Sequence, residues 1–187
     1  MKRSGKYYLW AIVLVLILGL SMLPGCSGDD GDGDGHVIAT YTVELYFINT
    51  DYAITGDESL EHYLVDTREF SIPADENPWI MILEDLKNVE PDFAETAVTN
   101  DVVFNDVYLD AEDDSLIVVD FESLSSGGSM QEGFLIGQIV NTIVKNSHIF
   151  MESNNVDKVQ FLVKGEKVES LMGHFDATEP FTIQNDE

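Results

Sequence analysis

Two segments near the start of the chain alternate apolar and polar residues, which predicts a pair of β-strands. In Tyr41–Ile48 every second side chain is apolar, and this period of two is typical of a half-buried strand. Tyr63–Ile72 is expected to form a second strand that ends at Pro73. The stretch 49–61 between them is polar and contains a glycine, so it is predicted to be a loop.

Apolar residues spaced at the period of an α-helix predict two helices. The first is expected to start at Pro78 behind the capping residue Asn77, with Trp79 in the core. The second follows a pair of glycines, and Ser129 with Glu132 is predicted to form its capping box. Its buried face is expected to consist of Ile136, Ile139, Val140, Ile143 and Val144.

The remaining apolar segments predict hairpins. Segments 101–109 and 116–121 flank a short acidic turn and are expected to pair with each other. Segment 158–163 is followed by Gly165–Glu166, which suits a two-residue turn with glycine first. Segment 168–172 is then predicted to pair back, and the last residues of the chain are expected to add an edge strand.

The predicted order of elements is β-β-α-β-β-α-β-β, which indicates an α+β fold. Strands joined as hairpins favour one mixed or mostly antiparallel sheet, with both helices packed on one face. The chain beyond the N-terminal region is long enough for one domain with a hydrophobic core. We expect this domain to span residues 41–187.

The N-terminal residues predict export and a lipid anchor. Basic residues precede the apolar run 7–23, the layout of a secretory signal that would occupy residues 1–25. The LPGC sequence that ends at Cys26 resembles the lipobox of bacterial lipoproteins. This resemblance implies that the Cys26 thiol is acylated and holds the chain to the outer face of the cell membrane. An uncleaved membrane anchor is the alternative, and it also places the domain outside the cytoplasm.

Residues 26–40 are predicted to be a flexible tether between the lipid and the domain. They are rich in glycine and aspartate, which neither form regular structure readily nor bury apolar surface. The motif D-x-D-x-D-G that begins at Asp30 matches the start of a calcium loop. The twelfth position of such a loop needs a carboxylate and holds Tyr41 here, so no metal site is predicted.

The chain is strongly acidic, with 35 Asp and Glu against 9 Lys and Arg and a formal net charge of −26. This charge argues against nucleic acid as a partner, because phosphates would be repelled. A solvated acidic surface suited to a saline or alkaline exterior is the favoured interpretation. A specific basic partner is the alternative, and it would be indicated by acidity concentrated at one site.

The sequence contains no recognisable catalytic, cofactor or metal motif. None of its serines lies in G-x-S-x-G, and none of its four histidines has the spacing of a zinc site. His174 and Asp176 are the best-placed polar pair, and they are expected to form a turn. We therefore predict that the chain is not an enzyme and carries neither a cofactor nor a metal.

Five segments together resemble a known family: YTVELYFIN, NPWIMILEDL, VVFNDVYLDAEDDSLIVVDF, QIVNTIV and VDKVQFLVKGEKVESLMGHFDATEPF. In order and spacing they are similar to the GerMN domain of bacterial sporulation and spore germination lipoproteins, over residues 41–183. The resemblance implies a non-enzymatic binding or assembly module of the cell envelope, linked to sporulation or germination.

An envelope protein or peptidoglycan is the expected partner, besides the membrane that holds the lipid. The candidate partner-binding residues are those expected to be exposed in a loop and a turn: Ser125, Ser126, Gly127, Gly128 and Gly165. The competing hypothesis is an envelope enzyme that acts on glycans through paired carboxylates, because carboxylates are too numerous for counting to exclude such a pair.

Overall fold

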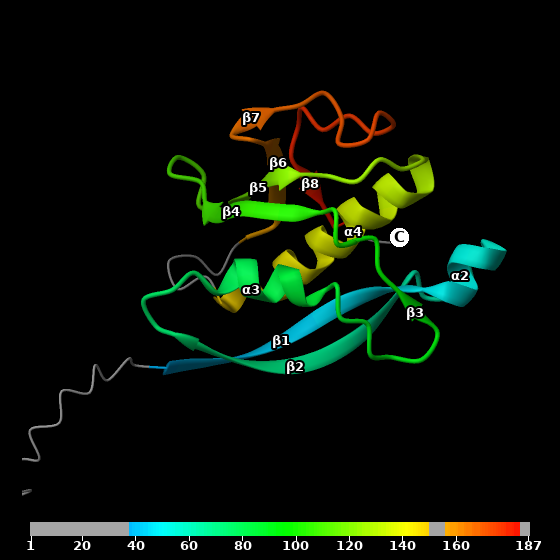
Figure 1. Cartoon of the computed structure of the whole chain (residues 1–187), viewed down its shortest axis with the longest axis horizontal. Coiled ribbons are helices and arrows are strands. Elements are labelled where there is room, and N and C mark those ends of the chain that lie inside the picture. The colour runs from blue at the N-terminus through cyan, green and yellow to red at the C-terminus, as the bar shows by residue number, and fades with distance from the viewer. Residues whose placement is uncertain (1–37, 150–155, 184–187) are drawn as a thin grey trace, which may run out of the picture. The chain divides into compact units, whose positions relative to one another are not determined.

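The computed structural model describes residues 38–149 and 156–183, which form an α+β fold (Figure 1). The predicted α+β class is therefore confirmed. The predicted signal peptide, Cys26 and most of the acidic tether lie outside the described residues. Within the described ranges, no helix is long and apolar enough to cross a membrane.

The first sheet is antiparallel and is built around β1 (Ile38–Asn49). β2 (Tyr63–Pro73) pairs with β1 along nearly its whole length, and β1 begins before the predicted Tyr41 because its first residues pair with the end of β2. β3 (Ala94–Glu95) pairs with the last two residues of β1 on its other edge. The predicted alternation is confirmed by the fully buried side chains of Val43, Leu45 and Phe47.

The short helix α2 (Thr50–Thr55) occupies part of the stretch 49–61, where a loop was predicted. Its start is capped by Asn49, whose Oδ1 accepts a hydrogen bond from the N–H of Asp51 at 3.1 Å. Its end is Gly56, which adopts a left-handed conformation with φ of 63°. Asparagine before a helix and glycine after it are ordinary start and stop signals, so the loop prediction was wrong.

The second sheet is mixed and contains β4 (Val103–Leu109), β5 (Leu116–Ser123), β6 (Lys158–Val163), β7 (Glu166–Lys167) and β8 (Phe181–Thr182). β4 and β5 form the predicted antiparallel hairpin. β5 and β6 run parallel, which requires a long crossover between them. β7 and β8 both pair antiparallel with β6, and β8 is the expected final edge strand.

The strands thus lie in two sheets and not in the single sheet that was predicted. Helix α4 (Ser129–Lys145) is the crossover between β5 and β6, and it contacts β1 of the first sheet as well as β6 and β8 of the second (Figure 1). Helix α3 (Pro78–Asp85) packs against β4 of the second sheet. A short 3-10 turn, η1 (Ser147–Ile149), follows α4.

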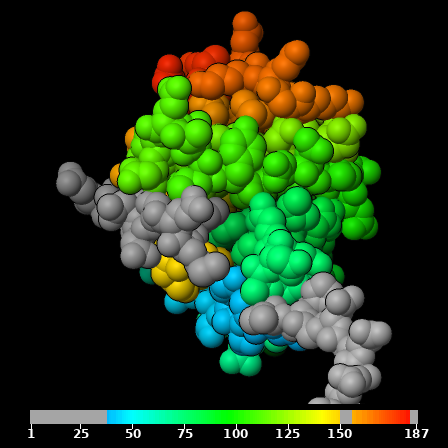
Figure 2. Space-filling model, turned by 90° about the vertical axis from the view of Figure 1, so that its left-hand side faces the viewer, coloured from blue at the N-terminus to red at the C-terminus, as the bar shows by residue number. Residues whose placement is uncertain are grey.

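Figure 2 views the molecule from the left of Figure 1 and shows the same order of segments from bottom to top. In Figure 2 the first strand, in blue, lies at the bottom, the β4 and β5 region, in green, lies above it, and the C-terminal segments, in orange and red, lie at the top. Both views therefore place the C-terminal segments and the first sheet at opposite ends of the domain.

The start of α3 confirms the sequence prediction and explains how the helix is placed. Asn77 Oδ1 accepts a hydrogen bond from the Trp79 N–H at 3.0 Å, and Pro78 is the first helical residue. Asn77 Nδ2 also donates to the carbonyl oxygen of Val107 at 2.6 Å. One side chain therefore caps α3 and fixes its first turn against β4, and Trp79 lies buried in the core as expected.

The start of α4 differs from the prediction. The capping residue is Gly128, which has no side chain to cap with, and Ser129 is already inside the helix. The predicted capping box is wrong because the Glu132 carboxylate hydrogen-bonds to a distant loop instead of to Ser129. The expected apolar face is confirmed: Ile136, Ile139, Val140 and Ile143 are buried and Val144 is partly buried.

The turn after β6 is shifted by one residue from its predicted position. It consists of Lys164 and Gly165, with φ angles of 56° and 78°, so both central residues are left-handed as a type I′ turn requires. Glu166 is already paired with β6. The expected strand 168–172 does not form, and the strand that pairs back, β7, consists of Glu166 and Lys167 alone.

Thr142 of α4 and Asn146, the residue that follows the helix, complete the edge of β1 beyond the point where β3 pairs with it. Asn146 Oδ1 accepts a hydrogen bond from the Glu44 N–H at 3.0 Å, and its Nδ2 donates to the Glu44 carbonyl oxygen at 2.8 Å. The Tyr46 N–H donates to Thr142 Oγ1 at 3.3 Å. The helix therefore satisfies backbone groups of β1 that a neighbouring strand would otherwise bind.

Replacing Asn146 by alanine is expected to lower the free energy of unfolding by about 2 kcal/mol, because it leaves both backbone groups of Glu44 without their partners. The change can be measured by urea denaturation. Asn141→Ala in the same helix is the matched control, since its Nδ2 bonds only within the helix, to Gly137. That control should change the free energy by no more than about 0.5 kcal/mol, and equal effects of the two variants would contradict the prediction.

Candidate functional site

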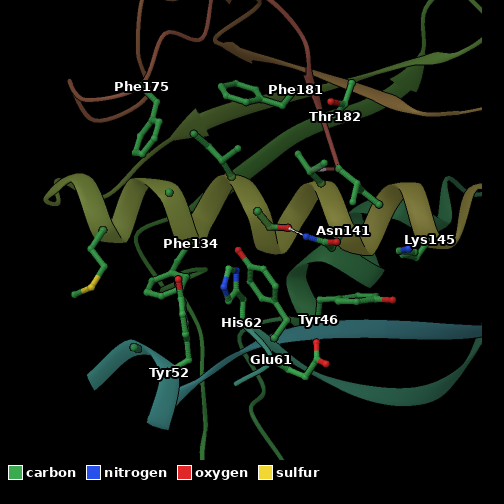
Figure 3. Close-up of a pocket in the computed structure, with 18 of the residues that line it drawn as sticks. Tyr46, Tyr52, Glu61, His62, Phe134, Asn141, Lys145, Phe175, Phe181 and Thr182 are labelled. Carbon is green, nitrogen blue, oxygen red and sulfur yellow. Dashed lines mark hydrogen bonds between the residues drawn. The ribbon is translucent and has the colours of Figure 1, made fainter. Parts of the chain in front are cut away.

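A groove of about 950 Å³ follows the solvent side of α4. Figure 3 shows α4 between two sets of side chains, with Phe175 and Phe181 on one side and Tyr52, His62 and Tyr46 on the other. The first set comes from the C-terminal segment, and the second comes from α2, β1 and the residue before β2. The fold thus brings three distant parts of the sequence to one concave surface.

Aromatic rings form the wall of the groove on the α2 side. Tyr52 stacks on His62 with ring centroids 4.0 Å apart and an angle of 24° between the rings. Phe134 of α4 meets Tyr52 edge to face at 6.3 Å and meets Tyr63 in the same way at 6.4 Å. Such edge-to-face pairs are favourable, so this wall is held in place by contacts between α2, β2 and α4.

Two glycines one helical turn apart allow aromatic rings to pack directly on the backbone of α4. A Cβ atom at Gly133 would lie 3.3 Å from the Phe175 ring, and one at Gly137 would overlap the hydroxyl of Tyr63. Burial raises the pKa of the Tyr63 phenol to about 12, so this hydroxyl stays neutral at physiological pH. The close approach of Tyr63 therefore requires glycine at position 137.

The C-terminal wall is anchored by one buried carboxylate, that of Glu132. Its Oε1 accepts hydrogen bonds from the Ser170 hydroxyl and from the N–H groups of Leu171 and Met172, at 2.8, 2.9 and 2.9 Å. Its Oε2 accepts from the His174 N–H at 2.8 Å. Burial alone would raise the pKa of Glu132, but these four hydrogen bonds outweigh burial and hold the pKa below its usual range.

The five residues predicted to bind a partner lie outside this groove. Ser126, Gly128 and Gly165 are exposed, whereas Ser125 and Gly127 are half-buried. The first four residues lead into α4, Gly165 lies in the turn between β6 and β7, and none of them lines the groove. A binding role for these five residues stays a prediction.

The predicted turn at His174 and Asp176 is confirmed. Asp176 Oδ1 accepts hydrogen bonds from the N–H and the hydroxyl of Thr178 at 2.9 and 2.5 Å. The ring of His174 lies with Nε2 3.3 Å from the carbonyl oxygen of Gly127. The His174 contact ties the C-terminal segment to the loop before α4, and neither set of contacts joins the His174 and Asp176 side chains to each other.

The sequence patterns point to none of the groove residues as a binding candidate. Tyr52 falls in a stretch predicted to be a loop, and Phe134 lies off the apolar face expected for α4. The one sequence signal that could have located the groove is the pair Gly133 and Gly137, because small residues one turn apart let other groups approach a helix closely.

The groove is nearly free of charge although the chain is strongly acidic. Glu61 is the only carboxylate and Lys145 the only Lys or Arg among the described residues that line it, whereas the chain has 35 Asp and Glu. Nowhere in the described ranges is a group of three or more His, Cys, Asp or Glu side chains placed to hold a metal ion. The groove can therefore offer apolar and aromatic contacts and a few hydrogen bonds.

The sequence and the fold match known proteins. The model of the Germane family, described as "Sporulation and spore germination", matches residues 44–169. No curated protein matches the sequence. The first GerMN domain of the sporulation protein GerM from Bacillus subtilis is similar in structure, with a TM-score of 0.50, 15% identity, and coverage of 78% of this chain and 99% of that one.

The tandem GerMN domains of the same Bacillus subtilis protein are also similar, with a TM-score of 0.50 and 15% identity. That match covers 77% of this chain and 46% of the tandem structure, so the chain spans about half of the tandem. At this level of identity the likeness shows a shared fold, and the match to the Germane family model confirms the resemblance to a GerMN domain.

Gly137→Ala is expected to destabilise the fold by about 1–3 kcal/mol, because the added methyl group overlaps the Tyr63 hydroxyl. This loss should exceed the gain of about 1 kcal/mol that alanine brings in a helix. Gly133→Ala is the control, since the partly exposed Phe175 ring can move aside, and it should be neutral or stabilising. Adding Tyr63→Phe to Gly137→Ala should recover part of the loss in urea denaturation; no recovery would mean that the hydroxyl is not the obstacle.

Glu132→Gln is expected to lower the free energy of unfolding at pH 7 by about 2–3 kcal/mol, because an amide offers one acceptor oxygen to donors that bind both carboxylate oxygens. The folded pKa lies below the usual value of 4.5. The stabilisation by the carboxylate is therefore fully present above about pH 4.5 and is lost as the pH falls through the folded pKa. Urea denaturation of both proteins between pH 7 and pH 3 should show their difference shrinking in acid; a constant difference would contradict this account.

Proposed function

Because the chain belongs to the Germane family of sporulation and spore germination domains, we propose that it is a binding module that engages a component of the cell envelope through the groove along α4. The proposal joins a sporulation-related domain with a concave surface that three parts of the chain build together. It assigns no catalytic step to the groove.

The distribution of charge and apolar surface supports this proposal most directly. Met130, Val65 and Phe175 line the groove and are 64%, 48% and 42% exposed. Exposed apolar side chains gathered in one concavity indicate an interaction site. A surface that serves only to solvate the chain would carry acidic residues in the groove as it does elsewhere. Among the described residues that line this groove, Glu61 is the only acidic one.

The proposed location is the outer face of the cell membrane. It is supported by the N-terminal sequence, in which the basic and apolar segments precede LPGC and the only cysteine of the chain, Cys26. A lipid on Cys26 would tether the domain through the glycine and aspartate tract. The groove would then act on partners within reach of the membrane.

We favour binding over glycan cleavage. A glycosidase needs two carboxylates that flank the scissile bond, and among the described residues the groove offers Glu61 alone. The family description and the two similar solved structures name a role in sporulation and name no reaction.

A pulldown with purified sacculi and with solubilised envelope proteins tests this proposal. The bait is the mature chain with Cys26→Ser, compared with the same chain carrying Val65→Glu in the groove. Val103→Glu on β4 is the matched control, because this valine is also on a strand, is 39% exposed and lies outside the groove.

We expect the bait to be retained by sacculi or by an envelope protein, without release of glycan fragments from the sacculi. Val65→Glu should abolish this retention, and Val103→Glu should preserve it. Binding that neither substitution changes would overturn the role of the groove. Release of glycan fragments would favour the enzyme hypothesis instead.

A further inference from the structure

The groove is bordered on both sides by exposed acidic residues, although its floor is almost uncharged. We infer that it accepts a short peptide segment of a partner protein, one that combines apolar side chains with lysine or arginine. This inference rests on the proposed binding function and names the chemical class of the ligand.

The first acidic border, here called the α2 rim, belongs to α2 and the connection to β2. Glu61 lines the groove, and Glu58 Oε2 lies 3.3 Å from Nε2 of the lining residue His62. Asp51 and Asp57 are chain neighbours of the lining residues Tyr52 and Gly56. All four of its carboxylates belong to exposed residues. The α2 rim consists of Asp51, Asp57, Glu58 and Glu61.

The second border, here called the C-terminal rim, consists of the exposed residues Asp176 and Glu179. In the sequence they fall between the lining residues Phe175 and Phe181. Figure 3 places these two rings on the opposite side of α4 from Tyr52 and His62. An occupant of the groove would thus meet negative charge on both sides. Cationic side chains that flank apolar ones are the complement of this arrangement.

The floor favours apolar side chains over sugar rings. Flat aromatic faces suit sugars, but Tyr52 has one face covered by His62 and lies nearly perpendicular to the Phe134 ring. Met130 and Val65 supply exposed aliphatic surface beside the Phe175 ring, and methionine adapts well to varied apolar partners.

A second copy of the chain is a poor occupant because both copies carry a large negative charge.

The groove is long enough for a peptide. Met130 and Lys145 lie near its two ends and both belong to α4. Lys145 is 15 residues after Met130, and at a helical rise of about 1.5 Å per residue the two are roughly 22 Å apart along the helix axis. At about 3.3 Å per residue, this length holds roughly six or seven residues of an extended chain.

The test uses labelled model peptides of about eight residues and the mature chain with Cys26→Ser, with fluorescence anisotropy as the readout. The first peptide alternates leucine and lysine, the second alternates serine and lysine, and the third alternates leucine and glutamate. Soluble peptidoglycan fragments serve as the glycan probe. All titrations are run at low and at high salt, because exposed charges are screened by salt.

The leucine–lysine peptide is expected to bind, and the serine–lysine peptide should bind about tenfold more weakly and lose its binding at high salt. The leucine–glutamate peptide should not bind. Equal binding of the two lysine peptides would mean that only the charge of the surface is recognised, and it would overturn the assignment of the groove to an apolar and basic segment.

Met130→Glu places a carboxylate in the groove and is expected to weaken the leucine–lysine peptide about tenfold, because its apolar side chains would meet a charge that must be desolvated. Met81→Glu on α3 is the matched control, since Met81 is 46% exposed and lies outside the groove. That control adds the same charge to the chain and should leave the affinity unchanged. Equal weakening by both variants would overturn the inference.

The outcomes also separate this inference from the proposed function. In one outcome, peptidoglycan fragments bind while the leucine–lysine peptide does not, and Met130→Glu weakens that binding. This result would overturn the peptide assignment and leave the groove as a binding site. A dimer that Met130→Glu dissociates would identify a second copy as the occupant and would also overturn it. Failure of all probes together with a negative pulldown would overturn both proposals.

Discussion

The two hydrogen bonds between the Asn146 amide and the backbone of Glu44 are the contact on which the arrangement of the two sheets depends. They fix α4 along the edge of β1, while the same helix is the crossover of the second sheet. Buried polar groups must be paired, so such bonds allow one placement of the helix where apolar contacts alone would tolerate several. Gln138 contributes in the same way, because its Oε1 accepts the Ala97 N–H at 3.0 Å.

The position of α4 in turn determines the groove. Once the helix is docked, Gly133 and Gly137 face the aromatic rings of the two walls, and Glu132 holds the segment that leads to the C-terminal wall. The groove is therefore built on a helix and its fixed neighbours, and side chains held by packing and hydrogen bonds present a preorganised surface. Preorganisation reduces the entropy that a ligand must sacrifice on binding.

The features that the sequence predicted are the ones that depend on local spacing. The alternation in β1, the cap at Asn77 and the apolar face of α4 follow from neighbours a few positions apart, and all three are confirmed. Some failures were local, such as the missed helix α2 between Asn49 and Gly56, but two involve distant partners. Glu132 has the spacing of a capping box but binds residues about forty positions away, and the division into two sheets depends on a parallel pairing that periodicity cannot reveal.

The Asn146 contact also has a consequence for biogenesis, because it joins residues 102 positions apart. A chain made from its N-terminus completes the β1–β2 hairpin long before α4, so the edge of β1 stays open until Asn146 has joined the chain. Contacts of such sequence separation slow folding, and an open strand edge invites pairing with other chains. The repulsion among its many carboxylates would keep nascent copies apart during that interval.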